Sequence, residues 1–158
     1  MLEKKVLFHL GKFSKKISFL VIVFLFSCST VIQGEFHSIG NRSTDFQFTP
    51  TQCYSGERLQ FHGIILSEKN SPAITVVGII DPIRGKVVKV INPKLCKNEE
   101  DCEEIFITKN QCSVFHFVVE PTNVRINKIR ALKGKLELDC DLTQGTKIKG
   151  NASFEYCH

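Results

Sequence analysis

Apolar and polar residues alternate along most of the chain, from Phe46 to Tyr156, with a period of two. This is the pattern of β-strands that bury one face. No segment after Cys28 keeps a helical period of 3.6 over three turns. About eight short strands, separated by turn signals, therefore predict an all-β domain. The expected architecture is a single antiparallel β-sandwich or a barrel-like sheet.

The alternation also predicts which side chains face inward. In CSVFHFVVE, residues 112–120, we expect Phe115, Phe117 and Val119 to point into the core and His116 to point away from it. A second strand is expected to direct Leu136, Leu138 and Cys140 inward.

Two apolar segments in the middle of the chain predict a hairpin. AITVVGII at 73–80 is almost entirely apolar, which is typical of a central strand buried on both faces. A turn signal at 81–85 connects it to the strand KVVKVI at 86–91. Leu59 and Phe61 predict one further strand, and residues 92–104, with five acids and one proline, predict a loop.

Seven cysteines also constrain the fold. If Cys28 has a separate role, six remain, and an even number in an exported domain predicts disulfides. Cys96 and Cys102 flank the acidic loop, so we expect them to pair. Cys140 and Cys157 bound the last predicted hairpin and form the second expected pair, which leaves Cys53 with Cys112.

The N-terminal region carries an export signal. Ten residues, 17–26, are apolar except for Ser18, and five lysines precede them. As a helix this run would extend ~15 Å, about half of a bilayer core. A run of this length behind a basic segment is typical of a signal peptide.

The residues that close this run, Leu25-Phe26-Ser27-Cys28, resemble the relaxed lipobox of spirochaete lipoproteins. The resemblance implies that residues 1–27 are a signal peptide and that Cys28 becomes the N-terminus. It also implies that Cys28 carries a diacylglycerol and an amide-linked acyl chain such as palmitate. Ser29 is not an acidic retention signal, which by resemblance favours the outer membrane. Residues 28–43 are then expected to be a flexible tether, and residues 44–158 the β-domain.

Other fates of the N-terminus remain open. Cleavage after Ser29 would give a secreted protein without lipid, and extension of the apolar run to Gln33 would give an uncleaved anchor of 17 residues. The sequons at Asn41 and Asn151 would matter only in a third case, a disulfide-rich module secreted by a eukaryote.

The β-domain resembles, in short segments, small exported bacterial proteins of an uncharacterised family. The segments are CYSGE at 53–57, LDC at 138–140 and FEYCH at 154–158. This resemblance implies no activity.

Catalytic motifs, nucleotide-binding loops and cofactor signatures are absent from the sequence. One alternative is a zinc site, for which the candidate ligands are Cys96, Cys102, Cys112 and His116. Another is an exported hydrolase or metal-dependent enzyme that uses His62 and His116 with Glu57 or Glu120.

The charge of the chain argues against nucleic acid as a partner. The formal net charge of +5 comes mostly from the N-terminus, because residues 1–27 contain five of the 21 basic residues and one of the 16 acidic ones. The remainder lacks the concentrated basic surface that nucleic acid requires. The sequence therefore predicts a lipid-anchored envelope protein, non-enzymatic and without a cofactor, that binds an envelope or host component.

Overall fold

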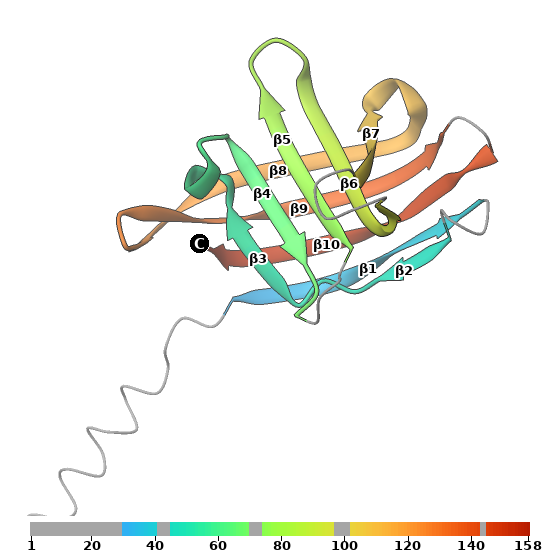
Figure 1. Ribbon diagram of the computed structural model, residues 1–158. Coiled ribbons are helices and arrows are strands. Elements are labelled where there is room, and N and C mark those ends of the chain that lie inside the picture. The colour runs from blue at the N-terminus through green and yellow to red at the C-terminus, as the bar shows by residue number, and fades with distance from the viewer. Residues whose placement is uncertain (1–29, 41–44, 70–73, 97–101, 143–144) are drawn as a thin grey trace, which may run out of the picture.

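The structure, a computed structural model, describes residues 30–40, 45–69, 74–96, 102–142 and 145–158. Within them, ten strands form two five-stranded antiparallel sheets that pack face to face (Figure 1). Sheet A has the order β2 (Phe46–Phe48), β1 (Val31–Ile39), β10 (Lys147–Cys157), β9 (Ile129–Asp141), β8 (Cys112–Ile126). Sheet B has the order β3 (Gln52–Ser55), β4 (Gly63–Ser67), β5 (Thr75–Asp81), β6 (Gly85–Cys96), β7 (Cys102–Thr108). The predicted all-β sandwich is confirmed.

Two short 3₁₀ helices complete the described structure. The first, η1 (Gly56–Leu59), connects β3 to β4 inside sheet B. The second, η2 (Lys109–Gln111), lies where the chain passes from β7 in sheet B to β8 in sheet A. The strand predicted at Leu59 and Phe61 begins later than expected, because Leu59 ends η1 and β4 begins only at Gly63.

The core lies between the sheets, and the predicted inward residues occupy it. Phe117, Leu136 and Leu138 are almost fully buried, and His116 is exposed, as expected. Phe117 reaches across from sheet A to Gly78 of β5, where a Cβ atom would lie 2.5 Å from its Cζ. Glycine at position 78 therefore makes room for the Phe117 ring of the facing sheet.

The predicted hairpin of β5 and β6 is confirmed, with Asp81 opposite Gly85. Its turn is held by the Asp81 carboxylate, which accepts hydrogen bonds from the backbone N–H groups of Ile83 and Arg84 at 2.8 Å. These bonds, that from Arg84 first, lower the pKa of Asp81. The turn is thus specified locally by one side chain.

Residues 31–39 correct the predicted domain boundary. We expected residues 28–43 to be a tether, but Val31–Ile39 form strand β1 between β10 and β2. Phe36 of this strand is 1% exposed and belongs to the core. The folded domain therefore begins near residue 30 rather than at residue 44.

The predicted acidic loop at 92–104 is shorter than expected. Strand β6 continues to Cys96 and β7 begins at Cys102, with these two cysteines opposite each other. The predicted signal peptide at 1–27 and the lipidation site Cys28 lie outside the described residues. Within the described ranges, no helix has the length and apolar character needed to cross a membrane.

Candidate functional site

All six cysteines after Cys28 form disulfides, and one of the three predicted pairs is confirmed. Cys96 bonds to Cys102 across the ends of β6 and β7. The predicted pairs Cys53–Cys112 and Cys140–Cys157 are wrong, since the observed bonds are those of Cys53 with Cys157 and of Cys112 with Cys140.

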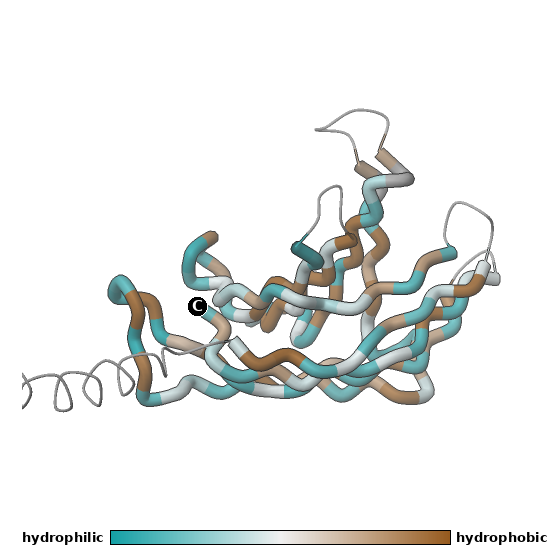
Figure 2. The backbone as a smooth tube through the Cα atoms, turned by 90° about the horizontal axis from the view of Figure 1, so that it is seen from below, coloured by the Kyte–Doolittle hydropathy of each residue, from teal (hydrophilic) through white to brown (hydrophobic). Residues whose placement is uncertain are grey.

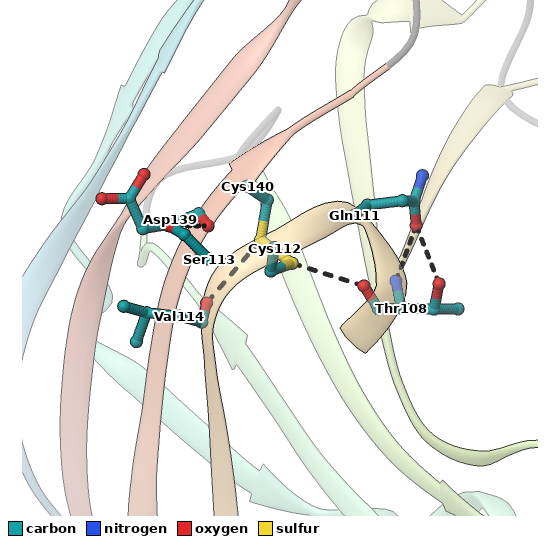
Figure 3. The surroundings of a disulfide bond; sticks show 7 residues. All are labelled: Thr108, Gln111, Cys112, Ser113, Val114, Asp139 and Cys140. Atoms are coloured by element: carbon teal, nitrogen blue, oxygen red, sulfur yellow. Dashed lines mark hydrogen bonds between the residues drawn. A yellow bond between two sulfur atoms is a disulfide. The ribbon is translucent and has the colours of Figure 1, made fainter.

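The register of sheet A explains the bond between Cys112 and Cys140. These residues lie opposite each other in the β8–β9 pair, after an irregularity between Cys112 and Val114. Figure 3 shows the neighbourhood, in which the Gln111 side-chain oxygen accepts hydrogen bonds from the backbone N–H and the hydroxyl of Thr108 at 2.8 and 3.0 Å. The disulfide therefore fixes the point where the chain changes sheets.

The bond between Cys53 and Cys157 joins the two sheets directly. Cys53 lies in β3 of sheet B and Cys157 at the end of β10 in sheet A, with 4.9 Å between their Cα atoms. Both side chains are buried in the core cluster. This disulfide closes the sandwich at the end where the chain enters β1.

These bonds overturn the alternative zinc site at Cys96, Cys102, Cys112 and His116. Zinc is held by thiolates, and the three sulfur atoms of that set are in disulfides instead. In the part of the chain that the structure describes, no other group of three metal-ligating side chains comes together.

The two histidines of the alternative enzyme lie apart. His62 is exposed in the bend before β4 of sheet B, whereas His116 is exposed on β8 of sheet A. Of the carboxylates proposed to help them, Glu57 accepts a hydrogen bond from the backbone N–H of Arg130 at 3.0 Å. The arrangement does not assemble His62 and His116 into one acid–base site.

His116 instead lines an open hollow of about 470 Å³ on the outer face of sheet A, together with Glu120 and Lys133. Gly134 also lines the hollow. A side chain does not fit at this position, since a Cβ there would lie 2.0 Å from the Val118 carbonyl oxygen. Lys133 and Glu120 approach to 3.7 Å.

Ion pairs cover the rest of this outer face. Lys135 donates to the Glu137 carboxylate at 2.7 Å, and this hydrogen bond lowers the pKa of Glu137. Lys149 contacts Asp139 at 2.8 Å, and His37 contacts Glu35 at 3.1 Å. These charged side chains are paired with one another and exposed, so this face is a solvated charged surface.

The outer face of sheet B has the opposite character. On each strand, some of the residues that alternate with the core positions are apolar, and none of these belongs to the core cluster. Among them Val77 and Val87 are buried by their neighbours, Phe106 is exposed and the others are partly exposed. We call this set the apolar face; it consists of Tyr54, Ile65, Val77, Ile79, Val87, Ile91 and Phe106.

Register places the members of the apolar face in continuous rows. Ile65, Val77, Lys89 and Phe106 follow one another across four strands, and Phe106 is 49% exposed. Lys89 is the basic residue within this row, and its ammonium group contacts Glu104 at 2.8 Å. The charge on this face is therefore neutralised within the face itself.

The sequence predicted the strands of the apolar face but not its exposure. The segment at 73–80 was expected to be buried on both faces, and this holds at its centre, where Val76 is buried in the core and Val77 on the opposite side, whereas Ile79 on that opposite side is only half-buried. The continuous apolar run could have predicted this face, because an antiparallel strand that is apolar at every position places one row of apolar side chains on the outside of the sheet. No family model, curated protein or solved structure matches this chain.

Proposed function

We propose that this protein is a lipid-anchored cell-envelope protein without enzymatic activity, whose β-domain binds a protein partner through the apolar face. The observation that carries the proposal is the contrast between the two outer faces: sheet A is covered by ion pairs, whereas the outer side of sheet B carries rows of β-branched and aromatic side chains, of which Phe106 is exposed and Ile65 and Ile79 are partly exposed. Contiguous apolar surface on a protein exterior is typical of interaction sites.

The anchor is supported by the sequence around Cys28, which resembles a lipobox and lies two residues before Thr30. Three disulfides support an oxidising compartment outside the cytoplasm. Two or three acyl chains hold a protein on a bilayer stably, whereas one does not. The envelope or host component that binds the domain is, in this proposal, a protein, because paired charges and apolar side chains make up the face.

The anchor is tested with Cys28→Ser in the full chain. We expect the wild-type protein to fractionate with membranes and to have an intact mass equal to residues 28–158 plus lipid. We expect the variant to be released, or to stay as an uncleaved precursor. Ser29→Ala is the matched control and should behave as the wild type. A wild-type mass that begins after Ser29 and lacks lipid would show simple secretion and refute the anchor.

The binding surface is tested by photo-crosslinking in the native host. A photoreactive amino acid replaces Phe106 on the apolar face or, as the control, His116 on the outer face of sheet A, which is equally accessible. We expect one adduct of defined mass from position 106 and none from position 116. In a second experiment, the photoreactive amino acid replaces Ile79 on the same face. Phe106→Glu in that background should weaken the complex and so reduce the yield of the adduct from position 79. Equal labelling from both faces, or none from position 106, would refute the proposal.

A further inference from the structure

One end of the sandwich carries the start of β1, and we call it the anchor end. The Thr30 hydroxyl donates to the Tyr156 carbonyl at 3.4 Å, and Val31 lies opposite Glu155. In Figures 1 and 2, the tip of the β8–β9 hairpin, η1 and the C-terminus lie at this same end. The hydrogen bond from the backbone of Arg130 to Glu57 joins the hairpin to η1.

Basic side chains gather at the anchor end without acidic partners. They are Arg58 of η1 and three residues of the β8–β9 hairpin: Arg125, Lys128 and Arg130. Among the described residues none of these four forms an ion pair, although the Arg58 guanidinium lies 5.9 Å from the centre of the Tyr54 ring. The four basic side chains are accompanied there by the carboxylates of Glu57 and Glu155, while nearby Glu120 is paired with Lys133.

The charges at the opposite end of sheet A are arranged differently. Where β9 ends and β10 begins, Lys147 contacts Asp141 at 2.7 Å and Lys149 contacts Asp139 at 2.8 Å. Each lysine there is neutralised by a neighbour on the adjacent strand. Within the described part of sheet A, basic side chains without an ion pair are therefore found at the anchor end, where they are available to an anionic partner.

Exposed apolar side chains accompany the basic ones. Leu59, the last residue of η1, is 66% exposed, and Val31 at the start of β1 is 45% exposed. Leu59 directly follows Arg58 in the sequence. Basic residues beside protruding apolar residues are typical of surfaces that rest in the headgroup region of a bilayer.

We propose that the anchor end lies directly on the membrane, with its basic side chains on anionic phospholipid headgroups and Leu59 in the interface. The proposal rests on the lipid anchor proposed above. Cys28 is two residues from Thr30, a distance that an extended chain limits to ~7 Å. Because Val31 already belongs to sheet A, the lipid has no long tether, and the domain is held close to the headgroups.

Fluorescence gives a direct test, since the chain contains no tryptophan. Leu59→Trp places a probe at the anchor end, and Ile39→Trp places the matched probe at the far end, where Ile39 is 70% exposed. Each full-length protein is purified from membranes and reconstituted in vesicles of phosphatidylcholine with phosphatidylglycerol. We expect brominated lipid to quench the L59W emission and to leave the I39W emission unchanged. Equal quenching of the two probes would overturn the proposal.

The role of charge is tested with two sets of four substitutions to glutamine that change the net charge equally. The first set removes the anchor-end residues Arg58, Arg125, Lys128 and Arg130. The control set removes lysines that are ion-paired on sheet A: Lys133, Lys135, Lys147 and Lys149. Only the first set should reduce L59W quenching, and high salt should have the same effect. Equal L59W quenching in the two sets would contradict the proposed contact. So would wild-type quenching that is as strong on pure phosphatidylcholine as on vesicles that contain phosphatidylglycerol.

A third measurement separates this proposal from the anchor. The Cys28→Ser protein, taken in its released form without lipid or signal peptide, is mixed with the same vesicles at low salt. Each basic residue near an anionic surface strengthens binding about fivefold. We therefore expect binding to phosphatidylglycerol vesicles that is at least about tenfold weaker in the anchor-end set than in the control set. Equal binding by the two sets would refute the basic contact even if the wild type is lipidated. Weaker binding by the anchor-end set would support the contact even if the wild type is not lipidated.

Discussion

The rings of Phe36 and Phe48 stack between β1 and β2 with their centroids 6.1 Å apart. Both rings are almost fully buried in the core. Because β2 is the edge strand of sheet A and pairs only with β1, this contact adds to the backbone pairing that holds β2 to the sandwich. Residues Val31–Ile39 are thus part of the fold and not a spacer.

A chain that begins at Asn41 should therefore fail to fold, whereas a chain that begins at Thr30 should fold. The shorter chain lacks all of β1, so β2 and β10 lose their shared partner. Both chains lack Cys28, so lipid does not affect the comparison. Circular dichroism during heating checks this: we expect a cooperative transition only from the longer chain. Identical melting curves would mean that β1 is dispensable.

Phe36→Ala should destabilise the full domain by about 3–5 kcal/mol, the usual cost of removing a buried aromatic ring. Ile39→Ala on the same strand is the control, since the side chain at 39 is largely exposed, and it should change the free energy of unfolding by less than about 0.5 kcal/mol. Urea denaturation of both variants measures the difference. Similar losses in the two variants would show that the Phe36 ring is not a core contact.

Gly78→Ala should destabilise the domain because the new Cβ would lie 2.5 Å from Cζ of Phe117. Overpacking of this kind costs about 1–3 kcal/mol. Phe117→Leu shortens the facing side chain, so the alanine at 78 should cost less in that background than in the wild type. A double-mutant cycle by urea denaturation measures this coupling. Additive effects would argue against the contact across the sheets.

The disulfides should differ in their contribution to stability. In the chain-entropy model, a bond with a sequence separation of 104, such as Cys53–Cys157, stabilises by about 4–5 kcal/mol. The bond between Cys96 and Cys102, with a separation of 6, closes a far smaller loop and stabilises by only about 2 kcal/mol. Alanine pairs at the two sites, compared by thermal unfolding, test the order. A greater loss from the short loop would contradict the entropic account.

The fold class was predictable because most strands bury one regular face. Strand β1 was missed because its inward positions include Gly34 and Ser38, which give little apolar signal. Gly34 is needed there, since a Cβ would lie 2.1 Å from the Asn151 carbonyl oxygen of β10. Close approach between strands therefore removed the periodicity on which the prediction depended.

The disulfide pairing was predictable only where it is local. Cys96 and Cys102 are close in sequence, but Cys112 meets Cys140 through a hairpin whose turn is Asn127-Lys128, without glycine. Both turn residues have positive φ, 49° and 70°. Two shifts of register then set which residues face each other. Likewise, Arg58 is distant in sequence from the basic residues of the β8–β9 hairpin, and only the tertiary fold brings it to the same end of the sandwich.

The ion pair of Lys135 and Glu137 predicts a pH dependence of stability. The hydrogen bond from Lys135 lowers the pKa of Glu137 below its usual value near 4.5, so the folded state favours the ionised carboxylate. This contribution is fully present above pH 4.5 and is lost as the pH falls through the lowered pKa. Glu137→Gln should therefore be less stable than the wild type at pH 7 and equally stable in strong acid. In a Lys135→Gln background the same substitution should have no effect at either pH. Urea denaturation across this range measures all four proteins, and a difference that persists in strong acid would show that Glu137 acts through packing rather than charge.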